Sequence, residues 1–416
     1  MVYDVIIIGA GPAGLFCGCN LHNNLKCLIL ERKARPGIKL LMSGSGQCNV
    51  THNGSIKDFL KHYGDNGKKI RQILYTFNND KLIEYFEVRH LKMTSREDGK
   101  VFPHSMNAKD VLDILLNDCK KNNVEISFNT MVSNIKYKED KKIFEVSSDN
   151  NLFQCRNLVV ATGGCSYPTT GSDGNIFAVL EALDIEINKP KPAIVPIYVE
   201  DYPYSHLSGI SFEKARIELY RSNKKIHTHT GDVLFTHNNF SGPGILDISR
   251  YIEQGDAIVL DYYNRKTKEA IIDELKYELT HSGNKILNTI IKEYFNFPKR
   301  FISIILESLK ADGSKKASQV SHKELIKIID KVVSDRFIVK KTGDFNIAMA
   351  TKGGVSLGDL DIKKLSSIKY PNLYFAGEVL DVDGDTGGYN LQFAFSSGIY
   401  CSGSINRYSD NNITVN

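Results

Sequence analysis

Three glycines near the start of the chain constrain its fold more than any other sequence feature. Gly9, Gly11 and Gly14 have G-x-G-x-x-G spacing and directly follow an apolar, largely β-branched run at residues 3–8. Such a run predicts a strand buried on both faces, and residues 13–23 predict the helix that follows it. A strand, a glycine-rich turn and a helix in this order are typical of a dinucleotide-binding unit of an α/β fold.

Each residue of the turn has its own physical role in such a unit. Gly9 permits the tight turn, Gly11 lets the backbone approach a pyrophosphate, and Gly14 lets the helix pack close to the strand. Pro12 and Ala13 open the helix, whose free N–H groups and partial positive charge favour phosphate groups. These five residues are therefore predicted to bind the phosphates of a dinucleotide.

An acidic residue closes the next predicted strand, residues 26–31. Glu31 lies 17 residues after Gly14, where a carboxylate can accept hydrogen bonds from the hydroxyls of an adenosine ribose. An acid here disfavours a 2′-phosphate, so the site is predicted to take FAD or NAD rather than NADP. Three basic residues of the loop that follows are further candidate contacts to the cofactor: Arg32, Lys33 and Lys39.

The loop at residues 41–53 is the second candidate ligand loop. It is rich in glycine and serine, so it can offer backbone N–H groups to an anion or to a flat ring. It directly follows the nucleotide-binding strands, where ligand loops gather, and Ser43 and Gly46 are its candidate contacts. Cys48 has no evident base beside it, so we expect this thiol to shape the loop rather than to act as a nucleophile.

Two later apolar runs, residues 157–161 and 372–376, are predicted to return to the same sheet. Each leads into further candidate cofactor contacts: Thr162 and Gly163 in the first case, Gly377 and Glu378 in the second. Before the first run, residues 107–121 predict a helix capped by Asn107. Short runs at 124–128, 131–137, 143–147 and 152–155 predict an antiparallel meander.

The sheet therefore begins at the N-terminus and is completed near the C-terminus, which brackets the middle of the chain as an insertion. Residues 1–188 and 345–416 are predicted to form one Rossmann-like α/β domain. Residues 189–344 form the insertion, which is β-rich over 189–263 and has three or four helices over 264–335. Lys189-Pro190-Lys191-Pro192 is the predicted linker between them, and residues 346–350 predict the first strand after the insertion.

Composition narrows the class of protein further. No apolar run is long enough to span a bilayer, and the first strand starts too early for a signal peptide, so a cytoplasmic protein without a membrane partner is expected. None of the eight cysteines forms C-x-x-C, which argues against a metal site and a dithiol redox pair. The sequence gives no indication of the oligomeric state.

The formal net charge of +5 is concentrated in the insertion. Residues 263–341 contain 17 Lys and Arg against 10 Asp and Glu. Solvated helix faces are the favoured explanation over an anion-binding patch. The lysine clusters lack interleaved aromatic residues for base stacking, which disfavours a nucleic-acid partner.

Several longer motifs resemble those of one protein family. They are the segment S-G-S-G-Q-C-N-V-T at 43–51, A-T-G-G with S-Y-P at 161–168, L-F-T-H with S-G-P at 234–243, and the run at 374–397. Together they are similar to the bacterial NAD(P)/FAD-dependent oxidoreductases of the BaiN and aminoacetone-oxidase kind, among the flavoproteins with two dinucleotide-binding domains. Gln47 departs from the family's usual Arg, and so removes a fixed charge from this loop. His52 departs from its usual Asn.

The resemblance implies FAD along the first strand–helix unit of a three-layer domain with a β-meander, and an insertion built as a barrel-like sheet plus helices. Val132 would bind adenine through its backbone, and Glu378 would meet the ribityl-pyrophosphate region. Gly388, Tyr389, Asn390 and Leu391 would lie at the pyrimidine end of the isoalloxazine. The helix that starts there can stabilise negative charge on the reduced flavin.

These features predict an FAD-dependent oxidoreductase that transfers hydride between flavin N5 and a small organic substrate. Enone-type reduction and amine oxidation by oxygen both remain open. Only one complete dinucleotide-binding unit is present, so NAD(P)H is expected as a transient donor or not at all. A non-redox protein of the same fold, either a binding protein or a nucleic-acid-modifying enzyme, is the competing class. No catalytic acid or base can be named from the sequence.

Overall fold

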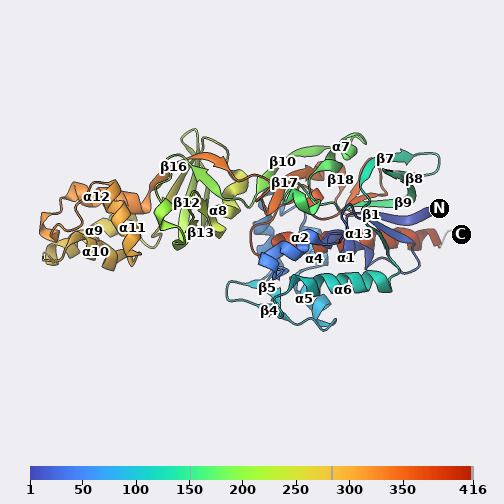
Figure 1. The fold of residues 1–416 in the computed structure, drawn as a ribbon, viewed down its shortest axis with the longest axis horizontal. Coiled ribbons are helices and arrows are strands. Elements are labelled where there is room, and N and C mark those ends of the chain that lie inside the picture. The colour runs from blue at the N-terminus through green and yellow to red at the C-terminus, as the bar shows by residue number, and fades with distance from the viewer. Residues whose placement is uncertain (150, 283, 414–416) are drawn as a thin grey trace. The chain divides into compact units, whose positions relative to one another are not determined.

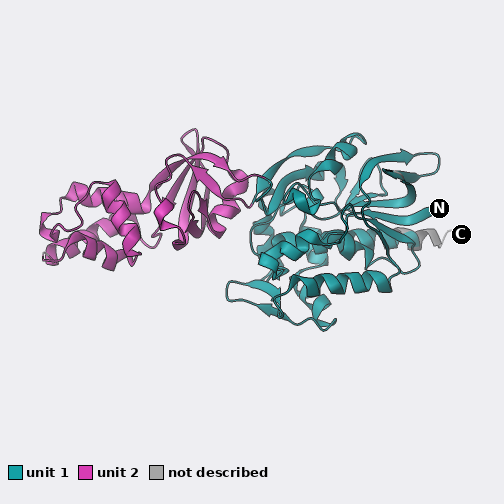
Figure 2. Ribbon diagram, viewed as in Figure 1, with its two compact units in different colours: residues 1–193, 345–416 teal, residues 194–344 magenta. Residues whose placement is uncertain are grey.

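The computed structural model describes residues 1–149, 151–282 and 284–413, and the chain divides into two compact units (Figure 2). Unit 1 comprises residues 1–193 and 345–416, and unit 2 comprises residues 194–344. The chain thus leaves unit 1, builds unit 2 from one continuous segment, and returns. No helix among the described residues is both long enough and apolar enough to cross a bilayer.

Unit 1 is built on a parallel sheet in the order β20-β9-β1-β2-β6. These strands are β1 (Val2–Ile8), β2 (Cys27–Leu30), β6 (Glu125–Ser127), β9 (Asn151–Val160) and β20 (Leu373–Phe375). Residues 5–8 of β1 and all of β2 are buried, as expected for strands covered on both faces. The short strands β18 (Leu360–Asp361) and β19 (Ser366–Ser367) extend the sheet beyond β20 in antiparallel fashion.

Helices and a meander form the layers on the two sides of this sheet. The helices α1 (Pro12–Gly18), α6 (Ala108–Lys121) and α13 (Tyr389–Ile413) pack together beneath the strands in Figure 1. The meander strands β7 (Val132–Lys138) and β8 (Ile143–Ser148) lie above with α7 (Asn175–Glu181). The side chain of Asn107 caps α6, as predicted, by accepting a hydrogen bond from the Lys109 N–H. The predicted Rossmann-like, three-layer fold class is confirmed.

Smaller elements complete unit 1. A three-stranded sheet has the order β3-β5-β4. The elements are α2 (Ile38–Met42), η1 (Ser43–Gly46), β3 (Thr51–His52), α3 (Ile56–Phe59), η2 (Leu60–Asn66), α4 (Arg71–Thr76), α5 (Asn79–Glu87), β4 (Met93–Ser95), β5 (Lys100–Pro103), η3 (Pro168–Thr170), η7 (Leu357–Asp359) and η8 (Gly377–Val379).

Four local predictions were wrong. A strand was expected at residues 346–350, but only Ala350, the first residue of β17 (Ala350–Val355), belongs to a strand. The runs at 152–155 and 157–161 were expected as two strands but belong to one, β9. The side chain of Arg156, between them, is exposed to solvent, so the strand continues through it without a turn. The run at 124–128 contributes β6 to the parallel sheet rather than to the meander. The predicted linker at 189–192 lies within β10 (Ile187–Ala193), which pairs only with β17 (Ala350–Val355) among the described strands. A two-stranded sheet tolerates proline because each strand has a free edge.

Unit 2 combines a closed barrel with a helical part. The barrel order is β11-β14-β13-β12-β15-β16. Its strands are β11 (Ile197–Val199), β12 (Ser211–Arg221), β13 (Lys224–Phe235), β14 (Phe240–Ser241), β15 (Ala257–Asp261) and β16 (Asp335–Thr342). The helices are α8 (Pro243–Ile248), α9 (Lys268–His281), α10 (Leu287–Phe295), α11 (Lys299–Ser308) and α12 (His322–Val333), with short 3-10 turns η4 (Ser205–Leu207), η5 (Ser249–Tyr251) and η6 (Ala317–Gln319). The barrel and the helices confirm the predicted composition of the insertion.

Candidate functional site

Parallel pairing brings most of the predicted contacts to one edge of the sheet. The carboxyl ends of β1, β2, β9 and β20 lie side by side, since these strands are consecutive neighbours in the parallel sheet. The segments that leave this edge carry the predicted residues Gly9 to Gly14, Glu31 to Lys33, Thr162 and Gly163, and Gly377 and Glu378. Thr130, two residues before Val132, also lies at this edge, because its N–H donates to the carbonyl oxygen of Glu31 over 2.9 Å.

The glycines of the first turn have different surroundings. A Cβ atom on Gly9 would lie 2.6 Å from the carbonyl oxygen of Ala161, and one on Gly14 would lie 2.0 Å from that of Gly9. Both glycines are therefore required by the protein's own packing. A Cβ atom on Gly11 would meet nothing within 4 Å. Open space beside the Gly11 backbone, at the start of α1, is what a bound pyrophosphate needs.

Glu31 organises this turn from within the protein. Its Oε2 accepts a hydrogen bond from the Ala10 N–H, and its Oε1 accepts one from the Lys33 N–H, both over 2.8 Å. The side chain is buried. A carboxylate has about four acceptor positions, so two remain for ribose hydroxyls. Sequence reasoning predicted the ribose contact but missed these two backbone contacts.

Glu31→Ala is therefore expected to affect both the empty protein and its affinity for the dinucleotide. The buried Ala10 N–H would lose its acceptor, at a cost of about 1–3 kcal/mol in the free energy of unfolding, and the partly buried Lys33 N–H would add a smaller loss. Loss of a charged hydrogen bond to ribose would weaken binding by a further factor of about ten or more. Urea unfolding of the apoprotein and FAD titration separate the two effects. If the affinity for FAD fell by no more than the loss of folding stability accounts for, Glu31 would not contact the ribose.

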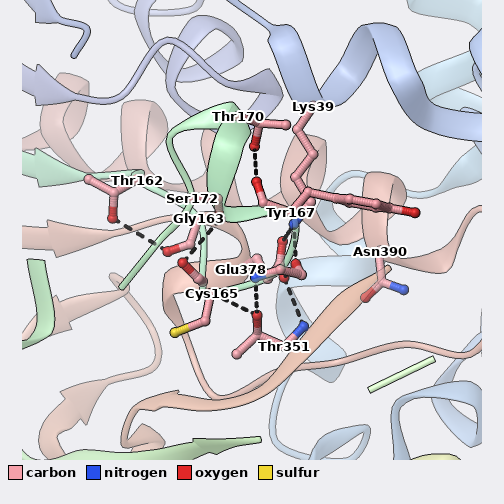
Figure 3. Close-up of polar contacts among 12 residues, drawn as sticks. Lys39, Thr162, Gly163, Cys165, Tyr167, Thr170, Ser172, Thr351, Glu378 and Asn390 are labelled. Atoms are coloured by element: carbon pink, nitrogen blue, oxygen red, sulfur yellow. Dashed lines mark hydrogen bonds and ion pairs between the residues drawn. The ribbon is translucent and has the colours of Figure 1, made fainter. Parts of the chain in front are cut away.

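A second polar cluster joins α2 to the end of β20 (Figure 3). Glu378 Oε2 accepts from Lys39 Nζ over 2.5 Å, while Oε1 accepts from Ser166 Oγ over 2.6 Å and from the Thr351 N–H over 2.8 Å. Lys39 also donates to Ser166. Thr351 Oγ1 accepts in turn from the Cys165 N–H over 2.8 Å. The cluster places one ammonium and one carboxylate, each partly exposed, at the same edge as the glycine turn.

The start of α13 is the second glycine-preceded helix start that the sequence predicted. A Cβ atom on Gly388 would lie 2.5 Å from the carbonyl oxygen of Thr51, so the helix begins directly against the loop at 41–53. The Asn390 side chain closes the preceding turn, accepting from the Gly384 N–H over 2.8 Å and donating to its carbonyl oxygen over 2.9 Å. Asn390 thus has a structural contact that sequence reasoning did not foresee. Leu391 follows it, half-buried.

Tyr389 lies between two histidine rings. The centroid of its ring is 5.3 Å from that of His52 and 4.1 Å from that of His62, with interplanar angles of 15° and 14°. His62 Nδ1 lies 2.9 Å from Asp385 Oδ2. A carboxylate can only accept, so Nδ1 is the donor and Nε2 is left to exchange a proton. Sequence reasoning missed this pair, because its members lie 323 positions apart.

The loop at 41–53 has an unusual backbone. Four of its residues have left-handed φ values between 55° and 85°: Gly44, Ser45, Gly46 and Cys48. Non-glycine residues in this region store strain, which is common at functional sites. The Oδ1 atom of Asn49 is buried without a hydrogen-bond partner among the described residues. Ser43 Oγ is bound locally, to the carbonyl oxygen of Leu40.

Arg96 restores a fixed charge to this loop. Its guanidinium donates to Gln47 Oε1 over 2.6 Å and lies 3.9 Å from the centroid of the Phe102 ring. The charge that Gln47 lacks is thus supplied from the turn between β4 and β5. Cys48 is fully buried, and burial raises the pKa of its thiol to about 12, which supports a shaping role rather than a nucleophilic one.

Arg32 and Lys33 lie in the segment that follows β2. Arg32 forms an ion pair with Asp173 at 2.6 Å, which ties this segment to the loop after β9. The carbonyl oxygen of Lys33 accepts from the Asn129 N–H over 3.1 Å. The structure therefore shows a structural contact for each. No cluster of three or more potential metal ligands occurs among the residues that the structure describes.

Comparisons with known proteins agree with this architecture. The HI0933-like protein Rossmann domain family matches residues 3–404. A protein from Haemophilus influenzae named ribosomal RNA dihydrouridine synthase is 31% identical over 97% of this chain and 98% of its own length. A 3-dehydro-bile acid delta(4,6)-reductase from Clostridium scindens is 27% identical over 94% of this chain and 96% of its own length.

One solved structure is similar over almost the whole chain. It is the 3-ketosteroid delta1-dehydrogenase from Sterolibacterium denitrificans in complex with 1,4-androstadiene-3,17-dione. The TM-score is 0.53 at 11% identity, and the match covers 98% of this chain and all of that one. At this identity the similarity concerns the fold.

Proposed function

The chain belongs to the HI0933-like family of FAD-binding Rossmann proteins, and we propose that it reduces a uridine of ribosomal RNA to dihydrouridine. At the coarser level it is an FAD-dependent oxidoreductase. The proposal is carried chiefly by the relative that is 31% identical over 97% of this chain, whose name states that reaction. The full-length match includes the basic insertion as well as the glycine-rich motifs.

The names of the two relatives describe the same chemistry on different molecules. Dihydrouridine arises when two hydrogens are added across the C5=C6 bond of uracil, which is conjugated to the C4 carbonyl. A delta(4,6)-reductase of a 3-dehydro-bile acid likewise saturates a carbon–carbon bond conjugated to a carbonyl. This shared reaction favours enone-type reduction over amine oxidation, the alternative that the sequence left open.

We propose the following contacts for FAD. The space beside Gly11 and the start of α1 would hold the pyrophosphate, Glu31 the adenosine ribose, and the backbone of Val132 the adenine. Glu378 would meet the ribityl-pyrophosphate region, next to Thr162 and Gly163. The start of α13 would lie at the pyrimidine end of the isoalloxazine. When bound, FAD supplies the hydride that the reaction needs.

We further propose that His62 supplies the proton. Conjugate reduction adds hydride to one carbon and a proton to its neighbour, so the protein needs a proton source near the substrate. The proton donor is the imidazolium form, in which Asp385 accepts from Nδ1–H and stacking on Tyr389 fixes the plane of the ring; Nε2 gives its proton to the substrate and takes a new one from solvent. The imidazole remains about one-third exposed and can therefore exchange a proton with substrate or solvent.

NAD(P)H is proposed as the transient electron donor. Unit 2 consists of a barrel and helices, and its described residues contain no second parallel dinucleotide-binding unit. A nicotinamide would then reach the flavin through the substrate's own access route. Reduction of a small dienone is the second candidate function, favoured by the bile-acid reductase relative.

Ribosomal RNA from cells that lack this gene is the substrate for the test. The purified protein is expected to be yellow and to release FAD on denaturation. With NADH or NADPH under anaerobic conditions it should form dihydrouridine, detected by mass spectrometry of the digested nucleosides. An absence of dihydrouridine would contradict the RNA proposal. Reduction of a steroid dienone instead would favour the second candidate, and reduction of the flavin by amines would favour an oxidase.

A further inference from the structure

A shallow hollow in unit 2 is lined mainly by basic and apolar side chains. It has a volume of ≈ 270 Å³ and lies between the turn η4 and the first half of α11. Its lining residues are His206, Leu207, Lys299, Arg300, Ser303 and Ile304. This volume falls just below the range of about 300–1,000 Å³ that is typical of sites for whole small molecules. It suits part of a larger ligand, such as one sugar-phosphate unit.

Two cations at the hollow are available for an anion. Among the residues that the structure describes, neither Lys299 nor Arg300 has an acidic ion-pair partner. Other lysines of the helical part are paired, for example Lys266 with Glu274 at 2.5 Å and Lys285 with Glu293 at 2.9 Å. Lys299 and Arg300 therefore carry part of the unpaired positive charge of the insertion; Lys292 and Lys310, for example, also have no acidic partner among the described residues.

Helix stability does not explain these two cations. Lys299 and Arg300 are the first two residues of α11, and the partial positive charge of a helix start disfavours a cation there. The first turns of α9 and α12 also contain a lysine, Lys268 and Lys323, but each has an acid beside it, Glu269 and Glu324, whereas the first turn of α11 has no acidic residue. The cations of α11 thus cost stability unless a negative charge approaches them.

The hollow is held rigidly by the barrel. Arg300 donates a hydrogen bond to the carbonyl oxygen of His206, which joins α11 to η4. The next residue, Phe301, is buried, with its ring centroid 4.6 Å from that of Phe212 and 5.1 Å from that of Tyr262. Leu207 is also buried and forms an apolar floor. The two cations are therefore presented from fixed backbone.

We propose that this hollow binds the sugar-phosphate backbone of ribosomal RNA, with Lys299 and Arg300 on a phosphate and Leu207 and Ile304 against the adjoining sugar. Basic side chains on phosphates provide affinity and register without reading the base sequence. Arginine suits this contact because its planar guanidinium can donate two parallel hydrogen bonds to one phosphate. The inference rests on the proposed function, since it takes ribosomal RNA as the partner.

The test compares RNA binding by the FAD-loaded wild type and two double variants. Lys299→Ala/Arg300→Ala removes the cations of the hollow, while Lys266→Ala/Lys285→Ala removes two ion-paired lysines and the same net charge. Dissociation constants for ribosomal RNA are measured by filter binding between 50 and 200 mM salt. The hollow variant should bind about tenfold more weakly, and the slope of log K against log salt should shrink by about one, because one phosphate loses its contact. The control should bind as the wild type does.

Two further results overturn the inference. One is an unchanged affinity and slope in the hollow variant, and the other is an equal loss in the control, which would indicate general charge attraction. Ser303→Glu places a negative charge in the hollow and should weaken binding without removing any cation. If the wild type forms dihydrouridine while the hollow variant binds RNA normally, the proposed role of the hollow is wrong and the proposed reaction stands. RNA binding without dihydrouridine would overturn the proposed reaction but not the hollow, and no RNA binding at 50 mM salt would overturn both.

Discussion

Gly11→Ala is expected to leave the apoprotein folded and to weaken FAD binding by about 10- to 100-fold. Gly11 has φ −80° and ψ −179°, which alanine adopts without strain, and its added methyl group would meet no protein atom within 4 Å. The same methyl group would occupy the space that a pyrophosphate needs. Overpacking of a close contact costs about 1–3 kcal/mol, or about 5- to 150-fold in the dissociation constant, and the expected loss lies within this interval.

FAD titration of the apoprotein, with its thermal midpoint measured in parallel, checks this expectation. Gly403→Ala is the matched control, because Gly403 lies within α13 and an added Cβ would have only an ordinary contact, 3.7 Å from Arg407. That variant should bind FAD as the wild type does. If Gly11→Ala retained full affinity, the pyrophosphate would not approach this turn, and the proposed position of FAD would be wrong.

Local sequence signals account for what could be predicted. The G-x-G-x-x-G spacing predicts the turn correctly because Gly9 and Gly14 each approach another backbone segment too closely for a Cβ atom. This requirement for glycine can be recognised from a few consecutive residues. The parallel strands were recognisable as short apolar runs, and their pairing places their carboxyl ends together. The β-rich part and the helices of unit 2 were expected from the sequence pattern, whereas the barrel-like arrangement of its strands was expected from the family resemblance.

Long-range contacts account for what could not be predicted. Glu378 draws its partners from three distant segments, through Lys39, Ser166 and Thr351, and no spacing in the sequence joins them. Arg96 reaches Gln47 from a different turn, 49 positions away. Strand β10, at the boundary between the two units, was missed for a related reason. Residues 189–192 have the composition of a linker, and they form a strand because β17 pairs with them. Each of these features depends on a contact between residues that are distant in the sequence and that only folding brings together.

His62→Ala is expected to lower the rate of substrate reduction by about 10²- to 10⁴-fold, the usual contribution of a positioned acid. FAD binding and the rate of flavin reduction by NAD(P)H should not change, because His62 is proposed to act only on the proton. Stopped-flow measurement of the two half-reactions separates these effects. In the second half-reaction, the chemically reduced protein is mixed with ribosomal RNA and flavin reoxidation is followed without oxygen.

His52→Ala provides the matched control for this prediction. Both histidines stack on Tyr389, but the two ring nitrogens of His52 lie 2.7 and 3.0 Å from the backbone carbonyl oxygens of Asn53 and Asp98. His52 is thus tied to the backbone, and its removal should alter stability more than the proton step. Added imidazole should restore part of the rate in His62→Ala and none in His52→Ala. Equal losses in both variants, without rescue, would assign His62 to packing of the Tyr389 ring and leave the proton to another group.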